Sequence, residues 1–131
     1  MRYLLDTNVV IALLNDATSK AARRVRREQP VDVAISAIAV HELYYGAFKS
    51  RRAAQNAALV DALQFVVLDF VKEDARQAGA IRAVLASKGT LIGAYDVLIA
   101  GQAVERNLIL VTHNVKEFSR VPGLRVEDWQ A

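Results

Sequence analysis

Short apolar segments alternate along this chain with longer segments in which apolar residues recur every three or four positions. The apolar segments predict β-strands at residues 3–5, 31–35, 65–68, 108–111 and 124–126. The periodic segments predict helices at residues 7–14, 17–28, 38–48, 52–63, 73–87, 96–106 and 114–118. Strands that alternate with helices in this way favour an α/β fold, with a parallel sheet covered by helices on both faces.

Residues typical of helix ends support these boundaries. Pro30 closes the helix at 17–28, and Ser36 is a suitable N-cap for the helix at 38–48. The chain has 131 residues, two prolines and no Gly/Ser-rich linker, low-complexity tract or internal repeat. We therefore expect one domain that covers residues 1–131.

Three carboxylates lie at positions where apolar residues are expected. Asp6 interrupts the first apolar segment, Glu42 lies among apolar and small helical neighbours, and Asp96 precedes an apolar run. An unpaired carboxylate is costly to remove from water, so such a residue usually indicates a cation or a catalytic role. Asp69 also interrupts an apolar run, but we expect it to face solvent at a strand end. An acid among apolar residues is therefore a weak signal unless its place in the fold supports it.

The places of the three acids do support a common site. Asp6 directly follows a predicted strand, Glu42 lies in the helix after the second strand, and Asp96 begins a helix. Thr112 and Asn114 follow another strand, and in α/β sheets sites form outside the carboxyl ends of the strands. Oxygen ligands without cysteine or suitably spaced histidines select Mg²⁺ or Mn²⁺, an ion that supports phosphodiester hydrolysis.

Charge and hydropathy limit the partners and the cellular compartment. The net charge is +3, with basic clusters at residues 20–27 and 49–52, which permits a nucleic-acid partner without requiring one. Each cluster could contact RNA, a protein partner or only solvent. No apolar run is long enough to span a membrane, no secretory signal is recognisable, and there are no cysteines. These features predict a cytoplasmic protein without a membrane partner.

Several short motifs occur in a specific order along nearly the whole chain. They are Leu5-Asp6-Thr7-Asn8, Ser36 followed by His41-Glu42-Leu43 and Gly46, Ile92-Gly93-Ala94-Tyr95-Asp96, Val111-Thr112-His113-Asn114, Glu117-Phe118, and the closing stretch from Val121 to Trp129. In these motifs the chain resembles PIN-domain ribonucleases, and among them the VapC-type toxins of type II toxin–antitoxin pairs. The resemblance implies a three-layer sandwich, with a central parallel sheet of about five strands flanked by helices.

The resemblance also implies roles for individual residues. Asp6, Glu42 and Asp96 would be the catalytic acids and would hold Mg²⁺ or Mn²⁺ together with Asn114. Many PIN domains have a fourth acid where this chain has Asn114, whose amide adds no charge for a second metal ion. The polar residues that would orient the ligands are Thr7, Asn8, Ser36 and Thr112.

The function implied is that of a toxin, a metal-dependent endoribonuclease that cleaves structured RNA such as transfer RNA. The implied partners are a VapB-type antitoxin that covers the active site and a second copy of the chain in a homodimer. Two alternatives remain open at this stage. One is a PIN nuclease of RNA processing outside toxin systems, and the other is a catalytically inert PIN-like module that binds RNA or protein, for which Asn114 is the one supporting feature.

Overall fold

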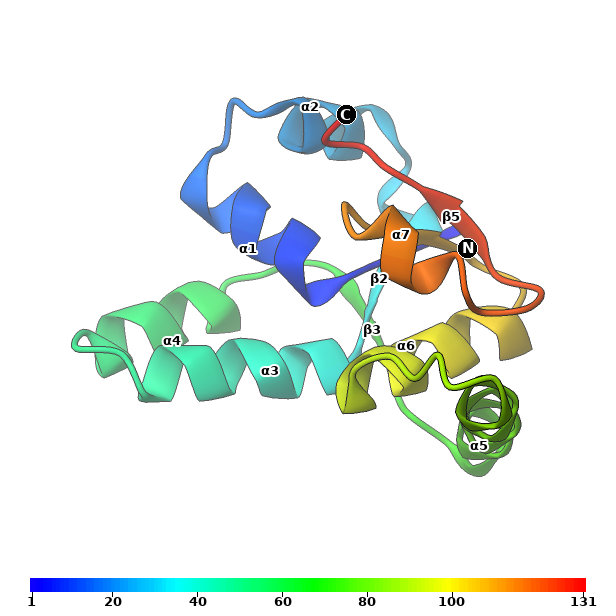
Figure 1. Ribbon diagram of the computed structural model, residues 1–131. Helices are drawn as coiled ribbons and strands as arrows, with labels where there is room; N and C mark the ends of the chain where they lie inside the picture. Colours follow the sequence, from blue (N-terminus) through cyan, green and yellow to red (C-terminus); the bar gives the residue numbers. More distant parts are fainter.

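Five parallel strands form one sheet at the centre of the protein, whose computed structural model describes residues 1–131 (Figure 1). The strands are β1 (Tyr3–Leu5), β2 (Val33–Ser36), β3 (Val66–Leu68), β4 (Ile109–Val111) and β5 (Arg125–Glu127). Their order is β3-β2-β1-β4-β5, with β1 in the middle. The predicted α/β fold with a five-stranded parallel sheet is confirmed.

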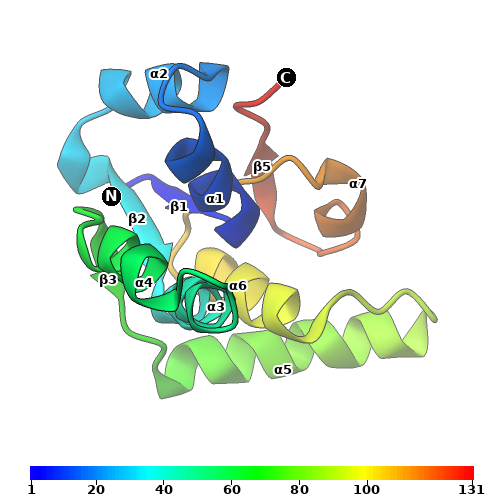
Figure 2. The ribbon, with the colours of Figure 1, turned by 90° about the vertical axis from the view of Figure 1, so that its left-hand side faces the viewer.

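Helices cover both faces of this sheet. They are α1 (Thr7–Asn15), α2 (Lys20–Arg27), α3 (Ala37–Phe48), α4 (Ala53–Asp61), α5 (Lys72–Ser87), α6 (Ala94–Glu105) and α7 (Val115–Phe118). Residues of α1, α2 and α4 pack in the core on one face of the sheet, and residues of α5 and α6 pack on the other. In both views α2 is at the top of the molecule and α5 is at the bottom (Figures 1 and 2). No helix combines the length and the apolar character needed to cross a bilayer.

The alternation of side chains along β1 divides the core between the two faces. Leu4 packs in the layer that contains α5 and α6, whereas Tyr3 and Leu5 pack in the layer that contains α1, α2 and α4. This division follows from the two-residue period of a strand, which points successive side chains to opposite faces. All three residues are buried, which explains why the strand reads as a continuous apolar run.

Several predicted boundaries differ from the structure by one to three residues; the helix expected at 17–28, for example, spans Lys20–Arg27. The strand expected from Val31 begins at Val33, because Pro30–Asp32 form a short 3₁₀ turn that leaves Val31 69% exposed. The helix expected to begin at Asp96 begins two residues earlier, at Ala94. The carboxylate of Asp96 therefore lies within the first turn of α6.

Helices α5 and α6 approach each other closely at Gly101. A Cβ atom added to Gly101 would lie 2.6 Å from the Cα and 2.7 Å from the backbone nitrogen of Ala78. Atoms of the backbone cannot move aside as a flexible side chain can, so only glycine fits at this crossing. This contact fixes the position of α6, the helix that carries Asp96.

A buried acid joins the same two helices one turn away from this crossing. The Asp74 side chain of α5 is almost fully buried and accepts hydrogen bonds from Val71 N, Gln102 Nε2 and the Arg106 guanidinium. Burial alone would raise the pKa of Asp74, but these bonds and the charge of Arg106 outweigh it and lower that pKa below its usual value. Gln102 and Arg106 also donate to the carbonyl oxygen of Asp69, while the Asp69 residue itself is exposed as predicted.

We predict that Gly101→Ala lowers the free energy of unfolding by about 1–3 kcal/mol, because α5 and α6 must separate. Gly79→Ala in α5 is the matched control. No atom lies within 4 Å of its added Cβ, so it should be neutral or stabilise the protein by about 0.4–1 kcal/mol. Urea denaturation of both variants measures the difference. Equal stability of the two variants would contradict the close crossing.

We predict that Arg106→Met lowers the free energy of unfolding by about 3 kcal/mol at pH 7, because it leaves the buried Asp74 carboxylate without its cation. Since the pKa of Asp74 is lowered on folding, the ion pair's contribution is present above the pKa of the unfolded chain, about 4. It is lost as the pH falls through the lower folded value. Urea titrations across this range should therefore show the stabilities of protein and variant converging in acid, whereas Arg76→Met on the exposed side of α5 should change little at any pH.

Candidate active site

The predicted site residues lie along the edge of the sheet where the parallel strands end. Asp6 directly follows β1, Ser36 is the last residue of β2, and Thr112 directly follows β4. Because these three strands are adjacent and parallel, their carboxyl ends meet at one edge. The remaining acids reach the same edge from α3, α6 and α7.

Asp6 is the most deeply buried of the site acids. Its side chain is the N-cap of α1, where Oδ1 accepts a hydrogen bond of 2.8 Å from the backbone N–H of Thr7. Its Oδ2 accepts a bond of 2.9 Å from the buried hydroxyl of Thr112. Burial raises the pKa of Asp6, and repulsion from Glu42 and Glu117 adds to the effect, while the two hydrogen bonds oppose it.

Glu42 is held beside Asp6 by Thr7, the first residue of α1. The hydroxyl of Thr7 donates a hydrogen bond of 2.8 Å to Glu42 Oε1. Ser36 begins the helix that carries Glu42, because its buried hydroxyl accepts from the backbone N–H of Ile38. Glu42 is half-buried, and its helical neighbour Tyr45 is 62% exposed. This face of α3 is therefore more exposed to solvent than its apolar sequence indicates.

Asp96 has the most perturbed acidity of the site. Burial raises its pKa to about 7, and the charges of Asp6, Glu117 and Glu42 contribute in the same direction. A shift caused by neighbouring carboxylates shows that these four acids share one region of negative potential. Asp96 therefore has the electrostatic environment of a functional residue rather than that of a surface acid.

Glu117 also belongs to this group of acids, although its sequence pattern did not predict it as a site residue. Its Oε1 accepts a hydrogen bond of 3.0 Å from Gly93 N, and its Oε2 accepts one from the Asn114 side-chain amide. The bond from Gly93 is the main reason that the pKa of Glu117 is lowered, and a hydrogen bond with Asp96 contributes. The three-residue spacing from Asn114 to Glu117, one turn of helix, is the sequence signal that places both at the site.

The structure distinguishes among the residues predicted to orient the ligands. Thr7 and Thr112 each donate to a site acid, and Ser36 caps the helix of another. Asn114 lies at the start of α7, with its backbone N–H bound to Thr112 Oγ1 and its side chain bound to Glu117. Asn8 is exposed on α1 and makes none of the hydrogen bonds of the site.

Four carboxylates therefore lie near one another at this edge, and the cation that acts on them is Arg120, which helps to lower the pKa of Glu117. Their oxygen atoms are suited to a hard divalent ion such as Mg²⁺ or Mn²⁺. No three acidic side chains lie close enough together to enclose an ion with protein ligands alone. Mg²⁺ is commonly held by only one or two carboxylates, and waters and substrate phosphate oxygens complete its coordination, so the residues present fit such an ion.

Gly93 leaves no space for a side chain beside Asp96. A Cβ atom added to Gly93 would lie 2.8 Å from Asp96 Oδ2, and the backbone N–H of the same residue binds Glu117. Since the atom met is the end of a side chain, the carboxylate can move at little cost in stability. We predict that Gly93→Ala lowers the affinity for Mn²⁺ about tenfold by displacing Asp96, as changes around metal ligands commonly do.

Calorimetric titration with Mn²⁺ measures this effect, and urea denaturation of the same variant should show a change of stability below about 1 kcal/mol. Gly79→Ala, where the added Cβ meets no other atom, is the control and should bind Mn²⁺ as the unaltered protein does. Unchanged affinity in Gly93→Ala would show that the position of the Asp96 carboxylate does not matter for the ion.

Comparison with known proteins agrees with this fold. The family model described as PIN domain matches residues 3–124. The chain is 40% identical to the "tRNA(fMet)-specific endonuclease VapC" of Salmonella typhimurium, and the alignment covers 98% of both proteins. The structure is similar to a chain of DNA-bound VapBC from Salmonella typhimurium, with a TM-score of 0.94, 40% identity and 98% of both chains covered.

A second solved complex, VapBC2 from Rickettsia felis bound to a DNA fragment of its promoter, gives a TM-score of 0.89. Its identity is 34%, and the match covers 98% of this chain and 99% of that one. Both the sequence and the fold are thus shared over nearly the full length. The chain belongs to the PIN domain family and, within it, to the VapC ribonucleases.

Proposed function

We propose that this protein is the toxin of a type II toxin–antitoxin pair, an endoribonuclease that uses Mg²⁺ or Mn²⁺ to hydrolyse phosphodiester bonds in structured RNA. Residues 1–131 act as one PIN domain in this proposal, and the compartment is the cytoplasm. The observation that carries it is the group of acids at the sheet edge, where Asp96 has its pKa raised to about 7. Such a site requires a cation to hold its charges together.

Asp6 and Asp96 would be the main metal ligands, and Glu42 would either be a third ligand or orient the attacking water. When bound, the ion lowers the pKa of a coordinated water and stabilises negative charge on the scissile phosphate. The protein fixes the ligands for this purpose. Asp6 is held by two hydrogen bonds, from Thr7 N and Thr112 Oγ1, and Glu42 is held by the Thr7 hydroxyl.

Asn114 and Glu117 act as a pair in this proposal. Asn114 stands where many PIN domains have an acid, and its amide aligns the Glu117 carboxylate three residues later. Glu117 has a lowered pKa and so supplies the negative charge that Asn114 lacks. A fourth charge at this end of the site favours an ion there once RNA phosphate oxygens complete its coordination.

The proposed substrate is structured RNA, with transfer RNA as the first candidate. A relative with 40% identity over the full length is named a tRNA(fMet)-specific endonuclease. Relatives from Haemophilus influenzae at 37% identity carry the broader name of ribonuclease VapC2 or VapC. More relatives therefore support the assignment as a ribonuclease than support one particular transfer RNA as the substrate.

An antitoxin would cover the site from the side of α1, α3 and α4. A groove of about 300 Å³ lies between these helices, and its lining includes Glu42 and the exposed apolar residues Ile11, Leu14 and Leu59. An antitoxin segment with apolar side chains fits this lining, and a basic residue on it would reach the acids. Similar chains have been solved as VapBC complexes, which supports an antitoxin partner, and the resemblance to VapC toxins supports a homodimer.

We predict that the purified chain, freed of any partner, cleaves transfer RNA in the presence of Mg²⁺ and that Asp96→Asn reduces the rate at least 100-fold. The loss follows from removal of a metal ligand and its charge. Gel analysis of end-labelled transfer RNA measures the cleavage. EDTA should abolish it, and Asn8→Ala, a change at an exposed residue outside the hydrogen-bond network, should have a far smaller effect. Full activity of Asp96→Asn, or equal activity in EDTA, would refute the mechanism.

Two further measurements separate this function from its rivals. Expression without an antitoxin should arrest growth, and a PIN nuclease of RNA processing would not do so. Calorimetry should detect Mn²⁺ binding in the presence of RNA. Absence of binding would favour the catalytically inert module, which holds no metal. If cells that express the active nuclease without an antitoxin continued to grow, that result would favour the RNA-processing enzyme.

A further inference from the structure

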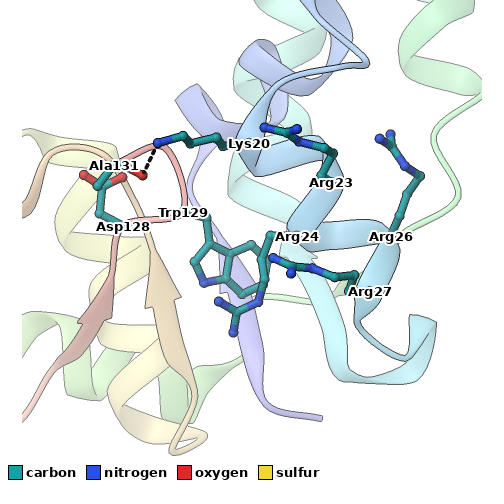
Figure 3. A pocket seen from close by; sticks show the side chains of 8 residues that line it. All are labelled: Lys20, Arg23, Arg24, Arg26, Arg27, Asp128, Trp129 and Ala131. Atoms are coloured by element: carbon teal, nitrogen blue, oxygen red, sulfur yellow. Dashed lines mark hydrogen bonds between the residues drawn. The ribbon is translucent and has the colours of Figure 1, made fainter.

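Helix α2 presents a concentration of positive charge to an open hollow on the side of the molecule above the sheet (Figure 3). The hollow has a volume of about 660 Å³. Its lining comprises five cations of α2, namely Lys20, Arg23, Arg24, Arg26 and Arg27, and the segment residues Asp128, Trp129 and Ala131. We call the five cations the α2 basic face. Asp128 is the single carboxylate side chain among these residues.

The spacing of these cations is unfavourable for the helix itself. Lys20, Arg23 and Arg27 follow one another at intervals of three and four residues, which places them on one side of α2. Like charges at such intervals destabilise a helix by a few tenths of a kcal/mol per pair. The row extends over about 10 Å at the helical rise of 1.5 Å per residue. An anionic ligand with several charges would relieve this repulsion.

Arg24 and Arg26 already have structural partners. Arg24 Nε binds Glu28 at 2.9 Å, and its guanidinium lies 4.6 Å from the ring centre of Trp129, which is itself buried against Tyr3. Arg26 donates to the carbonyl oxygen of Ala17. Together with the buried Ala21 and Ala22, these contacts fix α2 on the sheet and so hold its outer face in place.

Arg23 and Arg27 remain free. Both are exposed, and neither takes part in an ion pair or a side-chain hydrogen bond. Asp16 lies near enough for Arg23 to lower its pKa slightly, but the Asp16 carboxylate is bound mainly by the Thr18 hydroxyl and backbone N–H. Two guanidinium groups, four residues apart, are thus available for an external anion.

The hollow adjoins the candidate active site through one contact. Asp128, which lines it, binds the imidazole of His113 at 3.1 Å. His113 lies between Thr112 and Asn114, the residues that hold Asp6 and Glu117. A ligand that runs from the acids across this loop therefore reaches the α2 basic face.

We propose that the α2 basic face binds the phosphate backbone of the RNA substrate away from the point of cleavage, with Arg23 and Arg27 as the principal contacts. This inference rests on the proposed ribonuclease function and adds a substrate-binding surface to it. Nucleic-acid backbones are bound largely by Lys and Arg, and every nucleotide of an RNA strand adds one negatively charged phosphate. A row of cations about 10 Å long can therefore contact more than one phosphate of the same strand.

An acidic protein segment is a poorer match for this surface. Protein partners usually bind through aromatic or apolar anchors that fill pockets. The only large apolar residue of the lining is Trp129, which is 5% exposed and occupied by Tyr3 and Arg24. The lining therefore offers charge with little apolar area, which favours a nucleic-acid backbone.

The test compares two double variants with the same change of charge, both in the cleavage-deficient Asp96→Asn protein. Arg23→Gln/Arg27→Gln alters the α2 basic face, and Arg76→Gln/Arg82→Gln removes two exposed charges from α5, on the opposite side of the molecule (Figures 1 and 2). Fluorescence anisotropy with a labelled initiator transfer RNA gives the affinity between 50 and 200 mM salt, about the range where phosphate contacts dominate.

We expect Arg23→Gln/Arg27→Gln to bind about tenfold more weakly and to reduce the slope of log affinity against log salt by about two. The α5 variant should change both quantities much less. Equal affinity and slope in the two double variants would overturn the proposal. The proposal would also be overturned if Arg23→Gln/Arg27→Gln lost binding to a poly-glutamate peptide but still bound transfer RNA. That result would assign the α2 basic face to an acidic protein partner. Cleavage by the unaltered chain is read separately, so failure of the proposed function is distinguishable from failure of this surface.

Discussion

The buried hydrogen bond between Asp6 and Thr112 ties together the two central strands at the edge where the site lies. Asp6 ends the middle strand and caps α1, and Thr112 ends its neighbour β4. The same parallel pairing extends into this region, because Asp6 N binds the carbonyl oxygen of Val111. The hydroxyl of Thr7, the residue after Asp6, donates a hydrogen bond to Glu42 and so positions it relative to Asp6. The sheet thus fixes the position of one acid, and short hydrogen-bonded steps position the others relative to it.

The pKa values of buried Asp74 and half-buried Asp96 are shifted in opposite directions. This difference distinguishes an acid with a structural role from an acid of the functional site. Asp74 is surrounded by donors and by the Arg106 cation, so its pKa is lowered and its charge stabilises the contact of α5 with α6. Asp96 has three carboxylates near it and no cation, so burial and repulsion raise its pKa to about 7. The first acid has its counter-charge within the chain. The second is completed only by a ligand from outside it.

The sequence predicted the sheet and the three main acids, because apolar strands and acids at strand exits are local patterns. It placed Asp69 correctly at the surface. It did not reveal Asp74, because the partner that allows its burial, Arg106, is 32 residues away in the chain. Glu117 was missed as a site residue for a related reason, since a charge on a four-residue helix is typical of a solvated surface until tertiary contacts place Gly93 above it. Local patterns thus identified the acids whose setting is local.

The charge distribution poses a problem that the fold itself answers. An RNA approaching four carboxylates is repelled, and one bound divalent ion offsets only part of their negative charge. The net charge of +3 is too small to attract RNA by itself, but five of the cations are concentrated in the eight residues of α2. Asp128 lines the same hollow as the cations of α2 and binds His113, which is next to Thr112, so the attractive and repulsive regions are neighbours. A long polyanion can contact both regions at once, whereas a short one cannot, and this favours large structured RNA over small phosphate esters.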